Sequence, residues 1–324
     1  MVDQPARPSN LAGFDAEFRD LDHYIRVITH RIWEERRLDD IHRYYADPCV
    51  VETPMSVSTA REDVVTGTRA TLAQFPDRQL LAEDIIISGD AIGGYLSSHR
   101  IISPMTHTGD GNFGRATGKP IHVRTIADCV CKDNLIIHEW LVRDQAAIAV
   151  ALGIPLRALA QSWLDQRGGW NKPVAAPAPA FYRSAISPDE PAQRYANAIR
   201  NFTAGRINTA DTYDDAAHHL GPGNTTRYGH AQIGAYWQTL FSTFAVEDFE
   251  IEHLAIMREG GRATRAALRW RAQTRHLGDG EFGSASGKSV EIMGINHVEF
   301  WRGKVIREWV LVDEVALWMQ VLGR

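Results

Sequence analysis

Residues 107–119 read HTGDGNFGRATGK, and residues 276–288 of the same chain read HLGDGEFGSASGK. Nine of the 13 positions are identical, and the second copy begins 169 residues after the first. The same spacing relates the tripeptide at 138–140 to that at 307–309, and Asp144 to Asp313. A repeat of this length is too long for a solenoid unit and suits a whole small domain. The sequence therefore predicts two tandem copies of one domain.

Composition narrows the class of protein. The chain has 324 residues, of which 44% are hydrophobic and 23% charged, as is usual for globular proteins. Its net charge is −5 and it has no block of basic residues, so we expect neither nucleic acid nor a membrane as a partner. No signal peptide and no apolar run of roughly 18 residues is present, which favours a cytoplasmic protein. The three Cys have no metal-ligand spacing, and we expect no metal and no cofactor.

Hydrophobic periodicity predicts the order of elements in the first copy. Apolar residues recur every three or four positions from 15 to 37, which indicates an amphipathic helix. We expect further helices at 39–45, 67–75 and 145–164, and strands at 49–52, 80–88, 91–103, 121–131 and 135–142. Cys129 and Cys131 lie two apart on one strand, so both thiols should face the core.

A segment rich in Pro, Ala and Gly, residues 166–186, separates the copies and is typical of a semi-rigid linker. The second copy opens with a capping box, Ser187 to Glu190. Helices follow to 203 and at 206–214, 230–243 and 314–322, with strands at 246–257, 263–275, 289–301 and 304–312. The predicted domains are 15–165 and 187–324. Each is an α+β cone, in which a curved antiparallel sheet packs on N-terminal helices and leaves a pocket for a small molecule.

The order of these elements, the Thr/Ser-Gly-Lys end of each Gly-rich loop and the Glu-Trp-x3-Asp pattern resemble the SnoaL-like polyketide cyclases. These belong to the nuclear-transport-factor-two-like, or cystatin-like, superfamily. The resemblance covers most of both copies and implies the cone fold. It implies no single reaction, because related folds contain cyclases, isomerases, dehydratases, hydrolases and binding proteins.

In cyclases of this type an Asp located thirteen residues before the Trp acts as the general acid and base. Here Ala127 and Asn296 stand at that position, next to Asp128 and His297. The resemblance therefore suggests Asp128 and His297 as catalytic candidates and Asn296 as a substrate-binding residue. A neighbour on a strand points to the opposite face, so a bulge would be needed to bring either candidate into the pocket.

The repeated loops supply the other catalytic candidates. His107 with Asp110, and His276 with Asp279, place a carboxylate three residues after an imidazole. A hydrogen bond between them would fix the tautomer of the imidazole and raise its pKa, as a proton shuttle requires. The alternative is that Gly and Asp here only build the turn.

Several other side chains are candidates for the pocket wall. Trp suits such a wall, and His138 alternates with Glu139 so that it shares a strand face with Trp140. We expect Glu139 and Glu308 to be structural, and Asp144 and Asp313 to cap helices. The predicted substrate-binding residues are Trp140, Trp309, His138, Asn296, His218 and Tyr45.

Two functional hypotheses remain open. One is an enzyme that performs cofactor-independent acid/base chemistry on a small, partly apolar metabolite: cyclisation, isomerisation, dehydration or hydrolysis. The other is a non-catalytic small-molecule-binding or scaffolding protein. The second copy has more imidazoles, which favours it as the working pocket. We expect the sheets of the two copies to form an intramolecular pseudo-dimer, with further homo-oligomerisation open.

Overall fold

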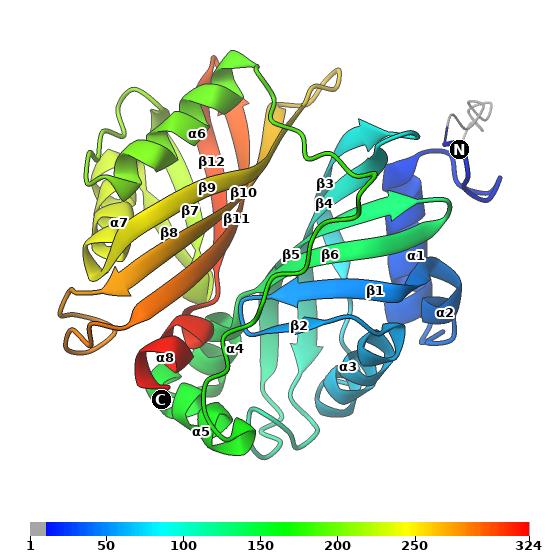
Figure 1. The fold of residues 1–324 in the computed structure, drawn as a ribbon, viewed down its shortest axis with the longest axis horizontal. Coiled ribbons are helices and arrows are strands. Elements are labelled where there is room, and N and C mark those ends of the chain that lie inside the picture. Colours follow the sequence, from blue (N-terminus) through cyan, green and yellow to red (C-terminus); the bar gives the residue numbers. More distant parts are fainter. Residues whose placement is uncertain (1–10, 324) are drawn as a thin grey trace.

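The computed structural model describes residues 11–323 and shows two α+β units in succession, each with a six-stranded sheet (Figure 1). The first unit contains α1 (Leu21–Trp33), α2 (Asp40–Tyr44), β1 (Tyr45–Thr53), β2 (Ser56–Ser58), α3 (Arg61–Gln74), β3 (Leu81–Asp90), β4 (Gly94–Thr106), β5 (Pro120–Lys132), β6 (Leu135–Arg143), α4 (Gln145–Leu152) and α5 (Leu156–Arg167). The second contains α6 (Glu190–Thr203), β7 (Tyr213–Gly221), a 3-10 turn η1 (Pro222–Asn224), β8 (Thr225–Tyr228), α7 (Gly229–Thr243), β9 (Phe244–Met257), β10 (Thr264–His276), β11 (Ser289–Trp301), β12 (Lys304–Val312) and α8 (Glu314–Leu322).

The two sheets have the same strand order, β2-β1-β6-β5-β4-β3 and β8-β7-β12-β11-β10-β9. This agreement confirms the predicted duplication and fold class. Strands β3 to β6 and β9 to β12 form the predicted antiparallel meanders. The prediction of wholly antiparallel sheets is wrong at one position in each unit, because β1 runs parallel to β6 and β7 runs parallel to β12. The chain between these strands includes a helix and a meander, which is long enough for the crossover that parallel pairing requires.

Three local predictions need correction. Residues 206–214 do not form a helix: Asn208 Oδ1 accepts a hydrogen bond from the backbone of Ala210, and the chain then enters β7. A short polar side chain that bonds to the nearby backbone competes in this way with the helix. The helix predicted over 145–164 is two helices, α4 and α5, joined at a left-handed Gly153. Asp189, rather than Ser187, is the N-cap residue of α6.

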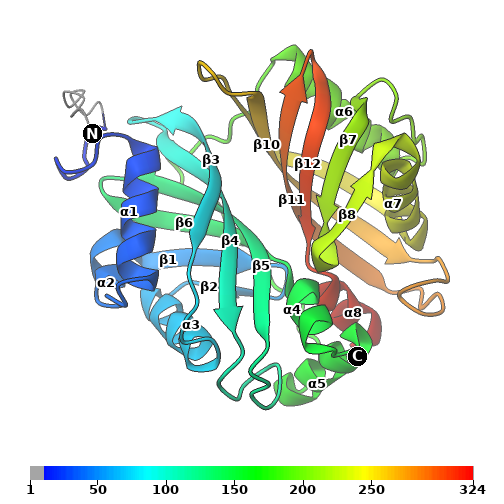
Figure 2. The same cartoon turned by 180° about the vertical axis from the view of Figure 1, so that it is seen from behind.

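Helices cover the outer face of each sheet, and the other two faces look toward each other (Figures 1 and 2). Helices α1, α2 and α3 lie on the first sheet, and α6 and α7 lie on the second. Leu96, Ile126 and Trp140 from the first unit form one buried cluster with Ile295 and Leu311 from the second. The two units therefore share a hydrophobic core between their sheets.

Charged side chains cross this core in an approximately two-fold arrangement. Arg269 of β10 donates to Asp128 of β5 at 2.6 Å, and its guanidinium lies 3.7 Å from the ring centroid of Trp140. Arg100 of β4 contacts Trp309 in the same way at 3.6 Å, and its Nη1 lies 3.2 Å from His297 Nδ1. The interacting residues are related by the same 169-residue spacing as the loops.

Helices α4, α5 and α8 connect the units at the base of the molecule (Figure 1). Asp144 and Asp313 cap α4 and α8, as predicted. Asp144 also accepts hydrogen bonds from the backbone of Gly223 and Asn224 in the second unit, at 3.0 and 3.2 Å. The limits 15–165 and 187–324 remain a prediction, because α5 belongs to the first unit by sequence but packs against α8 of the second.

Candidate functional site

The first unit encloses a chamber of about 280 Å³ between its sheet and its helices. Ile25, Ile28 and Ile32 of α1 form its apolar roof, and β4, β5 and β6 form its floor. The chamber opens into a wider mouth of about 530 Å³ at the end near α5. Both parts share the residues at their junction: Thr53, Gly67, Thr71, Arg78, Leu141 and Arg143. They therefore form one continuous cavity.

Strand alternation places the polar groups on the chamber floor. Glu139, Leu141 and Arg143 alternate along β6, so all three point to the helix side of the sheet. The register pairs Thr125 with Arg143, and Cys129 with Glu139. His99 of β4 lies opposite Ala127 of β5, in the row between them. A carboxyl, an imidazole, a hydroxyl and a guanidinium thus face one apolar chamber.

Burial shifts the pKa values of two of these groups, Glu139 and His99. It raises the pKa of Glu139 from 4.5 to about 7, and the nearby Arg143 partly opposes the shift. Burial lowers the pKa of His99 from 6.5 to about 3, so its imidazole is neutral at pH 7. His99 Nε2, Thr125 Oγ1 and Arg143 Nε are buried with no hydrogen-bond partner among the described residues. Groups of this kind are usually satisfied by water or by a ligand.

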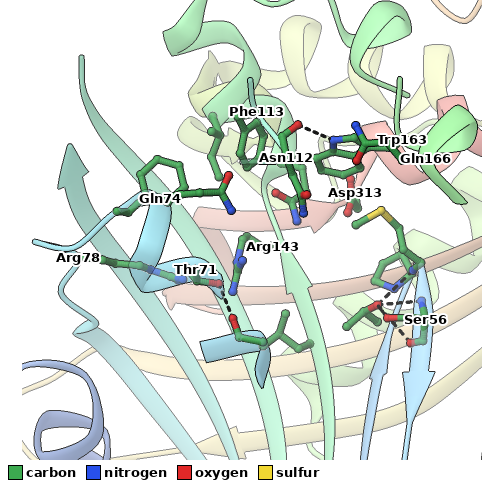
Figure 3. Close-up of a pocket in the computed structure, with 18 of the residues that line it drawn as sticks. Ser56, Thr71, Gln74, Arg78, Asn112, Phe113, Arg143, Trp163, Gln166 and Asp313 are labelled. Atoms are coloured by element: carbon green, nitrogen blue, oxygen red, sulfur yellow. Dashed lines mark hydrogen bonds between the residues drawn. The ribbon is translucent and has the colours of Figure 1, made fainter. Parts of the chain in front are cut away.

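The mouth contains residues from both units (Figure 3). Phe113 and Asn112 of the Gly-rich loop lie beside Trp163 of α5, whose Nε1 donates to the Asn112 carbonyl at 2.8 Å. Gln74 of α3 lies nearby, and Asp313 reaches the mouth from the start of α8. Burial raises the pKa of Asp313 to about 7. The second unit therefore completes the entrance to the cavity of the first.

The corresponding interior of the second unit is filled by side chains. Trp237 and Trp270 are fully buried there with ring centroids 6.4 Å apart. Glu308, the counterpart of Glu139, accepts from Tyr195 and Tyr213 at 2.6 and 2.7 Å and lies 2.6 Å from His219 Nδ1. An open depression of about 620 Å³ remains at the mouth, beside Tyr236 and Phe282. The duplicated cones thus differ: one is hollow and one is packed.

The predicted His–Asp pairs do not form within the described residues. Asp110 accepts from the backbone of Ala116 at 2.8 Å, and Asp279 accepts from Ala285 at 2.7 Å, so each carboxylate bridges its own loop. His107 and His276 are buried and bond through Nδ1 to a hydroxyl of the same loop. The expectation of a raised pKa is wrong, because burial lowers the pKa of both imidazoles and outweighs the nearby carboxylate. Their catalytic role stays a prediction, and neither His lines the cavity of its unit.

The structure places five other candidates between the two sheets instead of in a cone. Asp128 binds Arg269, and His297 lies 2.8 Å from Ser98 Oγ. Trp140 and Trp309 stack with the arginines described above. His138 stacks on Trp140 and lies 2.8 Å from Glu52. On β6 and β12 the Glu and Trp side chains thus point to opposite faces of the sheet, as predicted. The Trp side chains face the interface between the units, and the Glu side chains face the interior of each cone.

The remaining three candidates lie in three different places. Tyr45 lines the chamber of the first unit, where we expected a substrate contact. Asn296 lies inside the filled cone, where it donates to Tyr195 and accepts from Trp270. His218 is exposed and packs edge-on against Tyr228.

Sequence reasoning missed Glu139, His99 and Arg143, although a signal for them exists in the repeat. At the 169-residue spacing, Thr68 and Ile101 of the first unit correspond to Trp237 and Trp270 of the second. Large aromatic residues in one copy opposite smaller ones in the other indicate which interior is filled. Comparing the copies by side-chain size, instead of by the number of imidazoles, indicates that the first unit has the open interior.

Residues 11–323 contain neither a cluster of metal ligands nor a single membrane-spanning helix. No group of three or more His, Cys, Asp or Glu side chains is arranged to hold a metal ion. No single helix in this part of the chain is long and apolar enough to cross a membrane, and α4 with α5 passes that test only as a pair bent by 112°.

Comparison with known proteins assigns the family. The model described as SnoaL-like polyketide cyclase matches residues 24–152 and 177–321. IdmH from Streptomyces antibioticus is 20% identical over 41% of this chain and 98% of its own, with a TM-score of 0.36. TsrD from Streptomyces laurentii is 15% identical over 41% and 94%, with a TM-score of 0.36. A SnoaL-like polyketide cyclase from Agrobacterium tumefaciens is 18% identical over 41% and 98%, with a TM-score of 0.33. None of the curated proteins searched matches the chain. The family match covers most of both units, and the chain belongs to the SnoaL-like polyketide cyclase family.

Proposed function

We propose that the first unit is an enzyme that moves a proton to or from carbon in a small, partly apolar metabolite, with Glu139 as the acid and base. The observation that carries this proposal is a carboxyl facing an apolar chamber with its pKa raised to about 7. A group with this pKa is present in both protonation states at neutral pH, so it can accept a proton and return it.

The surrounding groups suit the charge that such a step creates. Removing a proton next to a carbonyl leaves an enolate, and its oxygen needs donors that are already in place. Thr125 lies on the same floor as Glu139, and its unpartnered hydroxyl is free to donate. The neutral imidazole of His99 carries one further N–H. Cyclisation, isomerisation and dehydration all contain this proton transfer, and in a hydrolysis the same carboxylate would activate water.

For the second unit we propose a supporting role. Its interior is occupied by Trp237, Trp270 and the hydrogen-bonded side chains around Glu308. It contributes Asp313 to the mouth of the first unit and holds the first sheet through Arg269. The scaffolding hypothesis is thus kept for this half of the chain.

Exchange of carbon-bound hydrogen tests the proposal without knowledge of the natural substrate. A panel of aryl ketones and β-keto esters is incubated with the protein in D2O, and loss of the α-proton signal is followed by NMR. We expect catalysed exchange for at least one compound, and a loss of about 100-fold or more for Glu139→Gln, as is usual when a general base is removed.

The duplication supplies a matched control. Glu308→Gln changes the equivalent residue in the filled cone and should leave the exchange rate unchanged in protein that remains folded. His276→Ala, in the same assay, tests the loop residue favoured by the sequence. Equal exchange by wild type and Glu139→Gln, or exchange lost in Glu308→Gln alone, would contradict the assignment.

A further inference from the structure

Two arginines, Arg78 and Arg143, line both the chamber and its mouth (Figure 3). Arg78 follows α3 and is 1% exposed, and Arg143 ends β6. We propose that the cavity takes an apolar carboxylic acid whose carboxylate binds between Arg78 and Arg143. The proposed anion site depends on Arg78 and Arg143 alone. The position of the acid's reacting carbon rests on the proposed role of Glu139.

Neither guanidinium forms an ion pair with a carboxylate among residues 11–323. The guanidinium of Arg143 makes no hydrogen bond to a described residue, and its buried Nε has no partner. Arg78 contacts the ring of Trp33 at 4.9 Å, and its only side-chain acceptor is Ser103 Oγ, at 3.4 Å. Burial lowers the pKa of both groups. The charge of Arg143 adds to the effect on Arg78, whereas Asp313 and Glu139 partly oppose the effect on Arg143. A buried cation without a partner is unfavourable, and a bound anion would relieve the cost.

Other arginines of the chain show how such groups are normally satisfied. Arg269 and Arg265 are about as buried as Arg78, and each forms an ion pair with an aspartate, at 2.6 and 3.0 Å, respectively. Arg271 has three glutamates around it. The two arginines at the cavity therefore differ from these three because neither has an ion-paired carboxylate.

The second unit provides an internal comparison. At the 169-residue spacing, Glu247 replaces Arg78 and Val312 replaces Arg143. Glu247 is partly exposed and pairs with Arg275 at the surface. The pair of unpartnered cations thus occurs in the unit that has a cavity and is lost in the unit whose interior is filled. A purely structural need for these cations would apply to both copies.

The geometry also orients the acid. Its carboxylate lies at the junction, and its apolar body extends under the isoleucines of α1, where the floor carries Glu139. Glu139 and Arg143 are four residues apart on one strand, so their Cα atoms are separated by roughly 13 Å. A reacting carbon several bonds away from the carboxylate fits this spacing. The substrate class is therefore an apolar acid with a remote enolisable carbonyl.

Calorimetric titration with matched pairs of probes tests the inference. The probes are benzoate, cinnamate and 2-naphthoate, each compared with its primary amide, which has nearly the same shape and no charge. We expect at least one acid to bind the wild-type protein about tenfold or more tightly than its amide, which equals about 1.4 kcal/mol. Arg78→Met and Arg143→Met should each remove that preference, and Arg143→Lys should keep part of it. Arg275→Met, a surface change near the Arg78 counterpart, should leave it unchanged.

Each outcome bears on a separate claim. Amides that bind as well as acids, acids that bind Arg143→Met as well as wild type, or no binding of any of the acids would overturn the inference. Circular dichroism and thermal unfolding identify variants that fail to fold, and Arg143→Lys then carries the test. Glu139→Gln should retain the acid preference. If it does, but exchange at carbon is unaffected by the same change, the anion site stands and the proposed function fails.

Discussion

The Glu139→Gln variant measures how much the free energy of unfolding falls when the buried carboxyl of Glu139 ionises. Burial raises the pKa of this group from 4.5 to about 7. A rise of about 2.5 pKa units corresponds to about 3 kcal/mol of stability that depends on pH. The folded state holds the proton more tightly than the unfolded chain does. This contribution is therefore fully present below pH 4.5 and is lost as the pH rises to about 7.

The predicted result is a difference curve with a definite sign. Gln stays neutral at every pH, so Glu139→Gln does not lose this stability as the pH rises. We expect the variant to gain up to about 3 kcal/mol relative to wild type between pH 5 and pH 8, and to show little pH-dependent difference below that window. Urea unfolding followed by circular dichroism at a series of pH values gives the free energies. Groups such as Asp313 titrate in both proteins and cancel in the difference.

Two results would refute the reasoning. A difference that stays constant from pH 5 to pH 8 would show that Glu139 ionises as it does in the unfolded chain. A variant that loses stability relative to wild type as the pH rises would show that the carboxylate is stabilised by a charge, which would then be Arg143. Direct titration of the carboxyl by 13C NMR distinguishes these cases and gives the pKa independently.

Two further predictions concern the cavity and the interface. Thr68→Trp copies into the first unit the residue that fills the second, and we expect it to abolish acid binding and exchange while the protein remains folded; retained binding to the variant would place the site elsewhere. Asp128→Ala removes the fully buried partner of Arg269 and leaves Glu252 to pair with it, which should cost about 3–5 kcal/mol of stability in urea unfolding. A loss below about 1 kcal/mol would show that Trp140 and Glu252 suffice to hold that guanidinium.

The duplication explains why one cone is filled and the other is open. Two copies that pack through their sheets share one interface, and the interface needs both copies to be stable. Under the proposed function, only one of the interiors has to bind a metabolite. Trp237 and Trp270 fill the second interior and increase its buried apolar surface, which favours folding. The first unit keeps polar groups without partners, which is costly for stability and useful for binding.

Much of the fold was accessible from the pattern of residues alone. The repeat at a spacing of 169 indicated two similar units, and apolar periodicity located most helices and strands within a few residues. Periodicity works because a helix or strand must bury one face, whatever its partner is. It failed at 206–214, where the side chain of Asn208 bonds to the backbone and ends any helix. It also left β1 unplaced beside β6, because strand pairing depends on distant parts of the chain.

The candidate site was less accessible. Alternation on β6 correctly separated Glu139 from Trp140, but it did not show which face looks into the cone. The Gly-rich loops are the most similar part of the two copies, and they are similar because both build the same turn around His107 or His276. Similarity between the copies therefore marked a shared turn. Of the residues in the proposed site, His99 and Arg143 differ between the copies, whereas Glu139 has an identical counterpart in Glu308.

The sequence by itself determined that the chain is a tandem pair of similar α+β units, because the repeat, the apolar periodicity and the turn residues are patterns that span only a few positions each. Only the tertiary structure decided that the first unit is hollow, that its floor carries Glu139 and Arg143, and that Asp128 and His297 hold the units together. Cavities and pKa values depend on which side chains meet across sheets and helices. That meeting is set by the packing of the whole chain, and a linear pattern does not contain it.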